Sequence, residues 1–123
     1  MYRLISLPRE FSQKNTVSMY DLLQAVGYAS IARQVSEQDL YDALFSHPDF
    51  VNEWLEYSED KRCTGWYFRL NDSNNYLVGY FDLNRNIETE YDNKLEACAA
   101  FVKRELDEII KKYPTPFHLY DEK

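Results

Sequence analysis

The sequence has little glycine and no long hydrophobic run. Its three glycines, Gly27, Gly65 and Gly79, are far apart, so no glycine-rich loop can hold a phosphate group. No apolar segment approaches the roughly 20 residues that a membrane span requires. The apolar start, residues 1–7, is followed at once by Pro8 and is too short for the core of a secretion signal. We therefore expect a cytoplasmic protein that has no membrane partner.

Cysteine and histidine are equally scarce. Cys63 and Cys98 belong to no paired motif, and neither His47 nor His118 forms a closely spaced pair with them. Structural zinc sites use such pairs, and a disulfide requires an oxidising compartment. We expect two reduced, partly buried thiols, no metal site and no cofactor. Because the usual catalytic motifs are missing as well, we expect no catalytic residues and no enzyme activity.

Positive charge is missing from one long stretch. Between Ser36 and Asp60 there is no lysine or arginine, and the stretch holds eight carboxylates: Glu37, Asp39, Asp42, Asp49, Glu53, Glu56, Glu59 and Asp60. The whole chain has a net charge of −7, with 21 acidic and 14 basic residues, whereas the remainder holds 13 acidic and 14 basic residues and so carries +1. Such a local field attracts cationic partners and repels nucleic acid. We therefore expect a basic protein partner and no nucleic-acid partner.

Serine marks two helix starts in the first half of the chain. Ser18 and Ser36 are each followed three residues later by an aspartate, which is the pattern of a capping box. Gly27 is a typical helix stop, Pro8 ends an alternating segment, and Pro48 can occupy the first turn of a helix. The predicted elements are a helix over 18–27, a further helical turn over 29–35, and two amphipathic helices over about 37–46 and 48–58. Residues 1–17 are ambiguous, and their alternation over 2–7 allows a short strand.

From Cys63 onwards the periodicity changes from that of a helix to that of a strand. The predicted elements are strands over 65–70, 76–81 and 87–91 and a last helix over 93–113. Residues 71–75 form turns readily, and strand 76–81 is apolar on both faces, which predicts a central place in the sheet. We expect one α+β domain over residues 1–123, with short N-terminal helices, a three-stranded antiparallel meander and a long C-terminal helix packed on the sheet. Residues 1–17 and 114–123 are expected to be less ordered.

The acidic residues fall on the polar faces of the two middle helices. Asp49, Glu53 and Glu56 form a row at i, i+4 and i+7. The last helix instead places acids four residues before lysines, as Asp107–Lys111 and Glu108–Lys112, which neutralises its face. Tyr57 lies beside the row, and tyrosine is enriched in interfaces. The predicted partner-binding residues are Asp39, Asp42, Asp49, Glu53, Glu56, Tyr57, Glu59 and Asp60. A merely solvated face is the alternative.

Four segments of the second half have the character of a known group of proteins. They are Trp54–Arg62, Gly65–Phe68, Val78–Asp82 and Ala97–Phe101, within about residues 50–110. These segments resemble small bacterial immunity proteins, which are encoded beside polymorphic or contact-dependent growth inhibition toxins and block the toxin domain. The resemblance implies an acidic cytoplasmic α+β protein whose partner is a cognate toxin domain, in many cases a basic nuclease. Two alternatives stay open: an adaptor or scaffold domain, for which a homo-oligomer is possible, and an acidic mimic of DNA.

Overall fold

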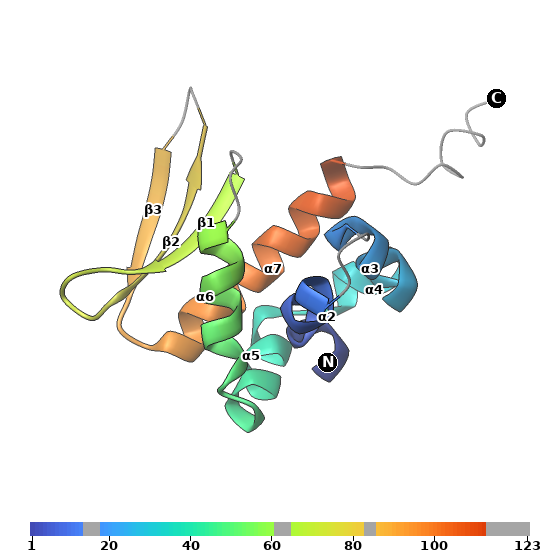
Figure 1. The fold of residues 1–123 in the computed structure, drawn as a ribbon, viewed down its shortest axis with the longest axis horizontal. Coiled ribbons are helices and arrows are strands. Elements are labelled where there is room, and N and C mark those ends of the chain that lie inside the picture. Colours follow the sequence, from blue (N-terminus) through green and yellow to red (C-terminus); the bar gives the residue numbers. More distant parts are fainter. Residues whose placement is uncertain (14–17, 61–64, 83–85, 113–123) are drawn as a thin grey trace.

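The chain forms a layer of helices against one face of a small sheet (Figure 1). The structure is a computed structural model and describes residues 1–13, 18–60, 65–82 and 86–112. Its elements are α1 (Tyr2–Ile5), α2 (Leu7–Gln13), α3 (Met19–Val26), α4 (Tyr28–Ile31), the 3-10 helix η1 (Ala32–Gln34), α5 (Glu37–Ser46), α6 (Phe50–Asp60), β1 (Gly65–Leu70), β2 (Tyr76–Phe81), β3 (Asn86–Tyr91) and α7 (Lys94–Lys112). This arrangement confirms the predicted α+β class. No described helix has both the length and the apolar character to cross a membrane.

The sheet is an antiparallel meander in the order β1-β2-β3, with β2 in the centre as predicted. Phe68 of β1 faces Val78 of β2 in the register of the first pair. The turn between these strands is built by asparagine. Asn74 adopts a positive φ of 65°, and the Asn71 side chain accepts hydrogen bonds from the backbone N–H groups of Ser73 and Asn75. Asparagine tolerates this conformation and bonds its local backbone, so the turn prediction is confirmed.

Gly79 is required in the centre of β2 because a tyrosine crosses over it. The Tyr67 side chain leaves β1, passes over Gly79 and donates its hydroxyl to Glu88 of β3. A Cβ atom at position 79 would collide with the Tyr67 hydroxyl and with the backbone oxygen of Ile87. The outer face of the sheet is thus organised by a contact that spans all three strands.

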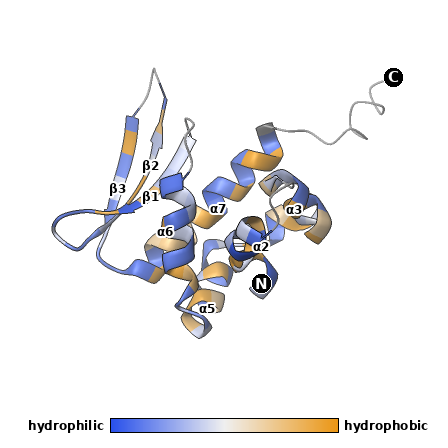
Figure 2. Ribbon diagram, viewed as in Figure 1, coloured by the Kyte–Doolittle hydropathy of each residue, from blue (hydrophilic) through white to orange (hydrophobic). Residues whose placement is uncertain are grey.

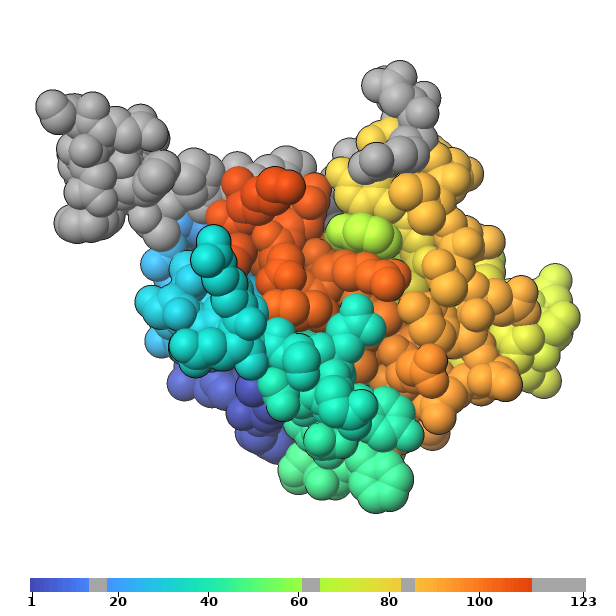
Figure 3. All heavy atoms as spheres, turned by 180° about the vertical axis from the view of Figure 1, so that it is seen from behind, coloured from blue at the N-terminus to red at the C-terminus, as the bar shows by residue number. Residues whose placement is uncertain are grey.

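The core lies between the sheet and the helices, with α7 at its centre. Figure 3 shows α7 between the sheet on one side and α3, α4 and α5 on the other, and Figure 2 shows hydrophobic positions alternating with hydrophilic ones along the helices. Trp54, Phe68 and Phe101 are almost fully buried. The Phe101 ring stacks on Phe68 at 5.6 Å and meets the Trp54 ring edge-on at 6.0 Å. These aromatic contacts join α6, β1 and α7.

The first residues are helical, so the short strand that the alternation over residues 2–7 allowed does not form. Leu4, Ile5 and Leu7 are buried in the core, and the carbonyl of Ile5 accepts a 2.9 Å hydrogen bond from the indole N–H of Trp54. Residues 1–13 therefore pack into the fold, and residues 14–17 lie outside the described residues. Pro8 does not end a strand; it occupies the first turn of α2, where a missing N–H costs nothing.

The predicted helix caps are confirmed, with small changes in the helix bounds. Ser18 and Ser36 both form complete capping boxes, and Gly27 closes α3 with a φ of 72°. Helix α6 begins at Phe50, so Pro48 precedes it and is not part of its first turn. The predicted last residue of the C-terminal helix, 113, and the segment 114–123 lie outside the described residues.

Of the two cysteines, Cys98 lies within the described residues and Cys63 does not. Cys98 is a free thiol inside α7, and it is fully buried rather than partly buried as predicted. Burial disfavours the thiolate and raises the pKa of Cys98 well above its usual value. A thiol in this state packs as a small apolar side chain.

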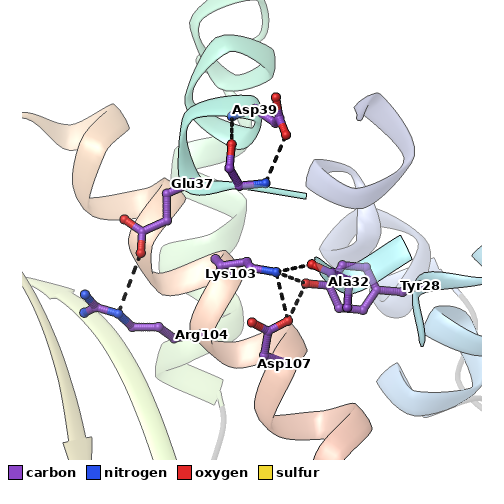
Figure 4. A network of polar contacts seen from close by, with 8 residues as sticks. Tyr28, Ala32, Glu37, Asp39, Lys103, Arg104 and Asp107 are labelled. Carbon is purple, nitrogen blue, oxygen red and sulfur yellow. Dashed lines mark hydrogen bonds and ion pairs between the residues drawn. The ribbon is translucent and has the colours of Figure 1, made fainter. Parts of the chain in front are cut away.

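A polar network fixes α4 and η1 to α7 (Figure 4). The Lys103 ammonium group donates to the carbonyl of Ala32 at 2.5 Å, to the Tyr28 hydroxyl at 3.2 Å and to Asp107 at 3.2 Å. Tyr28, which is fully buried, in turn donates to Asp107 at 2.6 Å. Asp107 thus pairs with Lys103, one turn earlier in the helix, whereas the sequence predicted a pair with Lys111, one turn later.

Candidate functional site

The acidic residues of α5 serve mainly the helix itself. The Asp39 carboxylate accepts a 3.0 Å hydrogen bond from the backbone N–H of Ser36 and completes the capping box. Asp42 accepts a bond from the Gln38 amide at 2.9 Å. Glu37 lies 4.0 Å from Arg104 of α7, a contact that Figure 4 also shows. Local hydrogen bonds of this kind are what a helix N-terminus requires, so the structure gives Asp39 a structural role.

The acidic row of Asp49, Glu53 and Glu56 is partly neutralised by a basic residue from outside the acidic stretch. Glu53 forms a two-pronged pair with Arg9 of α2, with nitrogen–oxygen distances of 3.2 and 2.5 Å. The hydrogen bond to Glu53 raises the pKa of Arg9, and the nearby Asp49 adds to this effect. The sequence could not show this pair because its members are 44 residues apart.

Farther along α6 the carboxylates have no such partner. Glu56, Glu59 and Asp60 are exposed and form no hydrogen bond or ion pair with any residue that the structure describes. Glu59 and Asp60 occupy the last turn of the helix, where the helix dipole disfavours negative charge. Helix stability therefore gives no reason for acids at these positions.

A groove lies between α2 and the acidic row of α6. Its volume is about 250 Å³, and its lining is Pro8, Phe11, Ser12, Glu53, Glu56, Tyr57 and Asp60. The four residues from α6 follow the spacing i, i+3, i+4 and i+7, which is one face of a helix. The three from α2 follow i, i+3 and i+4. The groove is the space between two facing helix surfaces, one apolar and one acidic.

Aromatic rings fix the shape of this groove. The Phe11 and Tyr57 rings meet edge-on at 5.9 Å, and Phe11 is 37% exposed. Tyr57 also packs on Trp54 at 5.4 Å and donates its hydroxyl to Glu105 of α7 at 2.7 Å. Glu105 is only 2% exposed, so the groove has a further carboxylate beneath its floor. Because Tyr57 is held from two sides, its ring can be positioned before a ligand arrives.

The eight residues predicted to bind a partner do not form one surface. The structure gathers four of them in the groove: Glu53, Glu56, Tyr57 and Asp60. Asp49 precedes α6, and Asp39 and Asp42 lie on α5. Glu59 lines a different hollow, of about 760 Å³, beside β1.

Sequence reasoning missed the α2 side of the groove. Pro8, Phe11 and Ser12 line it, but the sequence left residues 1–17 ambiguous and assigned Pro8 only to the end of an alternating segment. The available signal was a proline in a first helical turn followed by a glutamate, with Leu4, Leu7 and Phe11 at helical spacing.

Among the described residues, no group of three or more His, Cys, Asp or Glu side chains could hold a metal ion. No protein-family model, curated protein or solved structure matches this chain.

Proposed function

We propose that the groove between α2 and α6 binds a basic side chain of a protein partner. The observation that supports this is the meeting of Glu53, Glu56 and Asp60 with the rings of Phe11 and Tyr57 in one groove. An arginine or lysine side chain has the matching structure, because its apolar stem packs on rings while its charged end reaches carboxylates. Arginine fits better than lysine because its planar cation also stacks on aromatic faces.

We further propose that the protein is an immunity-type inhibitor, which neutralises a cognate toxin domain with a basic surface. The acidic surface and the resemblance of residues 50–110 to immunity proteins support this function. Under this proposal the protein acts in the cytoplasm, is not an enzyme, and requires no cofactor. Its acids accelerate association with a cationic partner, because steering by charge acts mainly on the association rate.

The groove is tested directly with a small probe. N-acetyl-arginine amide is titrated into the ¹⁵N-labelled protein, and the neutral analogue N-acetyl-citrulline amide serves as the control ligand. We expect chemical-shift changes at Phe11, Glu56 and Tyr57 with the arginine probe and none with citrulline. Shifts spread evenly over all acidic residues would contradict a defined groove.

The variant Glu56→Gln/Asp60→Asn removes two charges from the groove. The matched control Asp42→Asn/Asp72→Asn removes two charges from exposed aspartates elsewhere. We expect the first variant to lose the arginine-induced shifts and the second to keep them.

The inhibitor function predicts that a toxic domain is encoded beside the gene of this protein, and such a domain provides the test. The domain is expressed with and without the protein, and cell growth is measured. We expect the wild-type protein and the control variant to restore growth, and the groove variant to do so poorly. A partner that binds without losing its activity would favour the adaptor alternative instead.

A further inference from the structure

The sheet has one open edge, formed by β3. Within the described residues β3 pairs with β2 alone. Five of its six residues are exposed, and Tyr91 is partly buried. A free edge of this length presents unpaired backbone groups to which another strand can bond.

The opposite edge of the sheet, formed by β1, is closed at its centre by a hydrogen bond to α6. The same hydrogen bond shows in which direction the backbone groups of β3 point. The N–H of Phe68 bonds to the Ser58 hydroxyl of α6 at 2.7 Å instead of to β2. In an antiparallel ladder, Val78, which faces Phe68, then turns its backbone groups toward β3. By the same alternation, Glu88 and Glu90 turn their N–H and C=O groups toward the open edge.

The side chains at this edge alternate in character. Ile87, Thr89 and Tyr91 lie on the face that packs toward α7, and Glu88 and Glu90 lie on the outer face. A strand added beside β3 would place its own side chains opposite these two sets. Apolar residues would complement the first set, and basic residues the second.

Both glutamates are held in place before any strand is added. Glu88 accepts from the Tyr67 hydroxyl and lies 3.4 Å from Arg69. Glu90 accepts from the side-chain amides of Asn75 at 2.6 Å and Asn71 at 3.3 Å. Amides are neutral donors, so they orient the Glu90 carboxylate without cancelling its charge.

A second copy of this chain is a poor occupant of the edge. Two β3 strands paired about a two-fold axis bring the glutamates of one copy close to those of the other, and like charges that face each other destabilise a pair. We propose that the β3 edge accepts an extended basic segment of a protein partner as a fourth strand, with lysine or arginine alternating with apolar residues. This site is separate from the groove between α2 and α6, and the proposal does not depend on the groove.

To test this, a capped eight-residue peptide in which lysine and valine alternate is titrated into the ¹⁵N-labelled protein, and NMR spectra of the protein are recorded. One control peptide has the same composition in two blocks, and another has its alternate backbone nitrogens methylated. We expect shift changes at residues 86–91 and slower amide exchange at Glu88 and Glu90. Both controls should bind more than about tenfold more weakly, because each lacks either the alternation or several backbone hydrogen bonds.

A variant of the protein separates the effect of the Glu90 charge from that of its hydrogen bonds. Glu90→Gln keeps an acceptor for the two asparagine amides and removes the charge. We expect this variant to bind the alternating peptide about two- to fivefold more weakly than the wild type does. Asp42→Asn, an equal change of charge on α5, should have no effect. Equal binding of the block peptide, or shifts confined to α5 and α6, would overturn the proposal. Self-association that perturbs residues 86–91 would also overturn it, in favour of a second copy.

Discussion

Helices α6 and α7 both carry many charges, but they place them differently. On α7, each charged side chain of the central turns contacts another part of the fold: Lys103 and Asp107 contact Tyr28, Arg104 lies over the Trp66 ring, Glu105 accepts from Tyr57, and Glu108 accepts from Tyr80. On α6, Glu56, Glu59 and Asp60 have no such contact among the described residues. The difference separates charges that hold the fold from charges available to a partner.

This comparison predicts opposite consequences of mutation on the two helices. Substitutions on α7 should reduce stability, because they leave a buried group without its partner. Substitutions on the outer face of α6 should leave stability nearly unchanged and affect binding.

The largest effect is expected for Lys103→Met on α7. The variant keeps most of the side-chain volume and removes the donor to Ala32, Tyr28 and Asp107. Because the Lys103 side chain is only 18% exposed, its partners lose contacts that water replaces poorly. We expect a loss of about 2–3 kcal/mol in the free energy of unfolding, measured by urea denaturation. A loss below about 0.5 kcal/mol would remove the distinction between the helices.

Tyr28→Phe should cost about 1 kcal/mol at neutral pH, because one hydrogen bond to Asp107 is lost. Burial, together with that hydrogen bond, raises the pKa of Tyr28. The unfolded chain therefore loses the phenol proton at a pH where the folded protein keeps it, so the unfolded state binds fewer protons. Stability must then fall as pH rises above about 10, by about 1.4 kcal/mol per pH unit.

The Tyr28→Phe variant has no phenol at this position, so it lacks the pH-dependent contribution of Tyr28 to stability. Lys103 is present in both proteins. The stability difference between wild type and variant, followed by urea denaturation from pH 8 to 11, should shrink above about pH 10. A difference that stays constant over this range would contradict a raised pKa for Tyr28.

Glu53→Lys and Glu56→Lys should differ although both reverse a charge on α6. Glu53→Lys breaks the pair with Arg9 and brings two cations together, so we expect a lower melting temperature. Glu56→Lys breaks no contact with a described residue and should change stability by less than about 0.5 kcal/mol. Thermal unfolding of the two single variants checks this order. Equal melting temperatures would show that the Arg9 pair contributes nothing measurable.

The smallest effect on stability is expected for Glu56→Gln/Asp60→Asn. Removing charge from the last two turns of α6 relieves an unfavourable interaction with the helix dipole, so the melting temperature should stay the same or rise slightly. Binding to a cationic partner should weaken, mainly through a slower association rate that depends on salt. Stopped-flow measurements at low and high ionic strength distinguish this from a change in dissociation. An unchanged rate would leave the α6 acids as a solvated face.

Local signals in the sequence predicted most of the elements. The capping boxes at Ser18 and Ser36, the stop at Gly27 and the asparagine turn before β2 each depend on neighbouring residues, so their structures follow from short segments. The N-terminal segment could not be assigned from the sequence, because six residues allow either an alternating or a helical interpretation. Its helices are held by contacts with distant residues, such as the hydrogen bond that the Ile5 carbonyl accepts from Trp54, 49 residues away.

The candidate site shows the same limit. The acids of α6 were visible as a charged run, and their helical spacing placed Glu53 and Glu56 on one face. The opposing surface from α2 and the Arg9 pair depend on how distant segments meet. Composition and periodicity contain no information on such contacts, which is why the predicted site included Asp39 and Asp42 as well.

The hydrogen bond between the Trp54 indole and the Ile5 carbonyl makes the N-terminal segment visible to fluorescence. Trp54 is fully buried, whereas Trp66, the only other tryptophan, is partly exposed beneath Arg104. In a Trp66→Phe protein, emission and acrylamide quenching report on Trp54 alone. Release of residues 1–13 from the core would then appear as a red shift of the Trp54 emission maximum. One optical signal would report both on the packing of α1 against the core and on the position of α2 beside the groove.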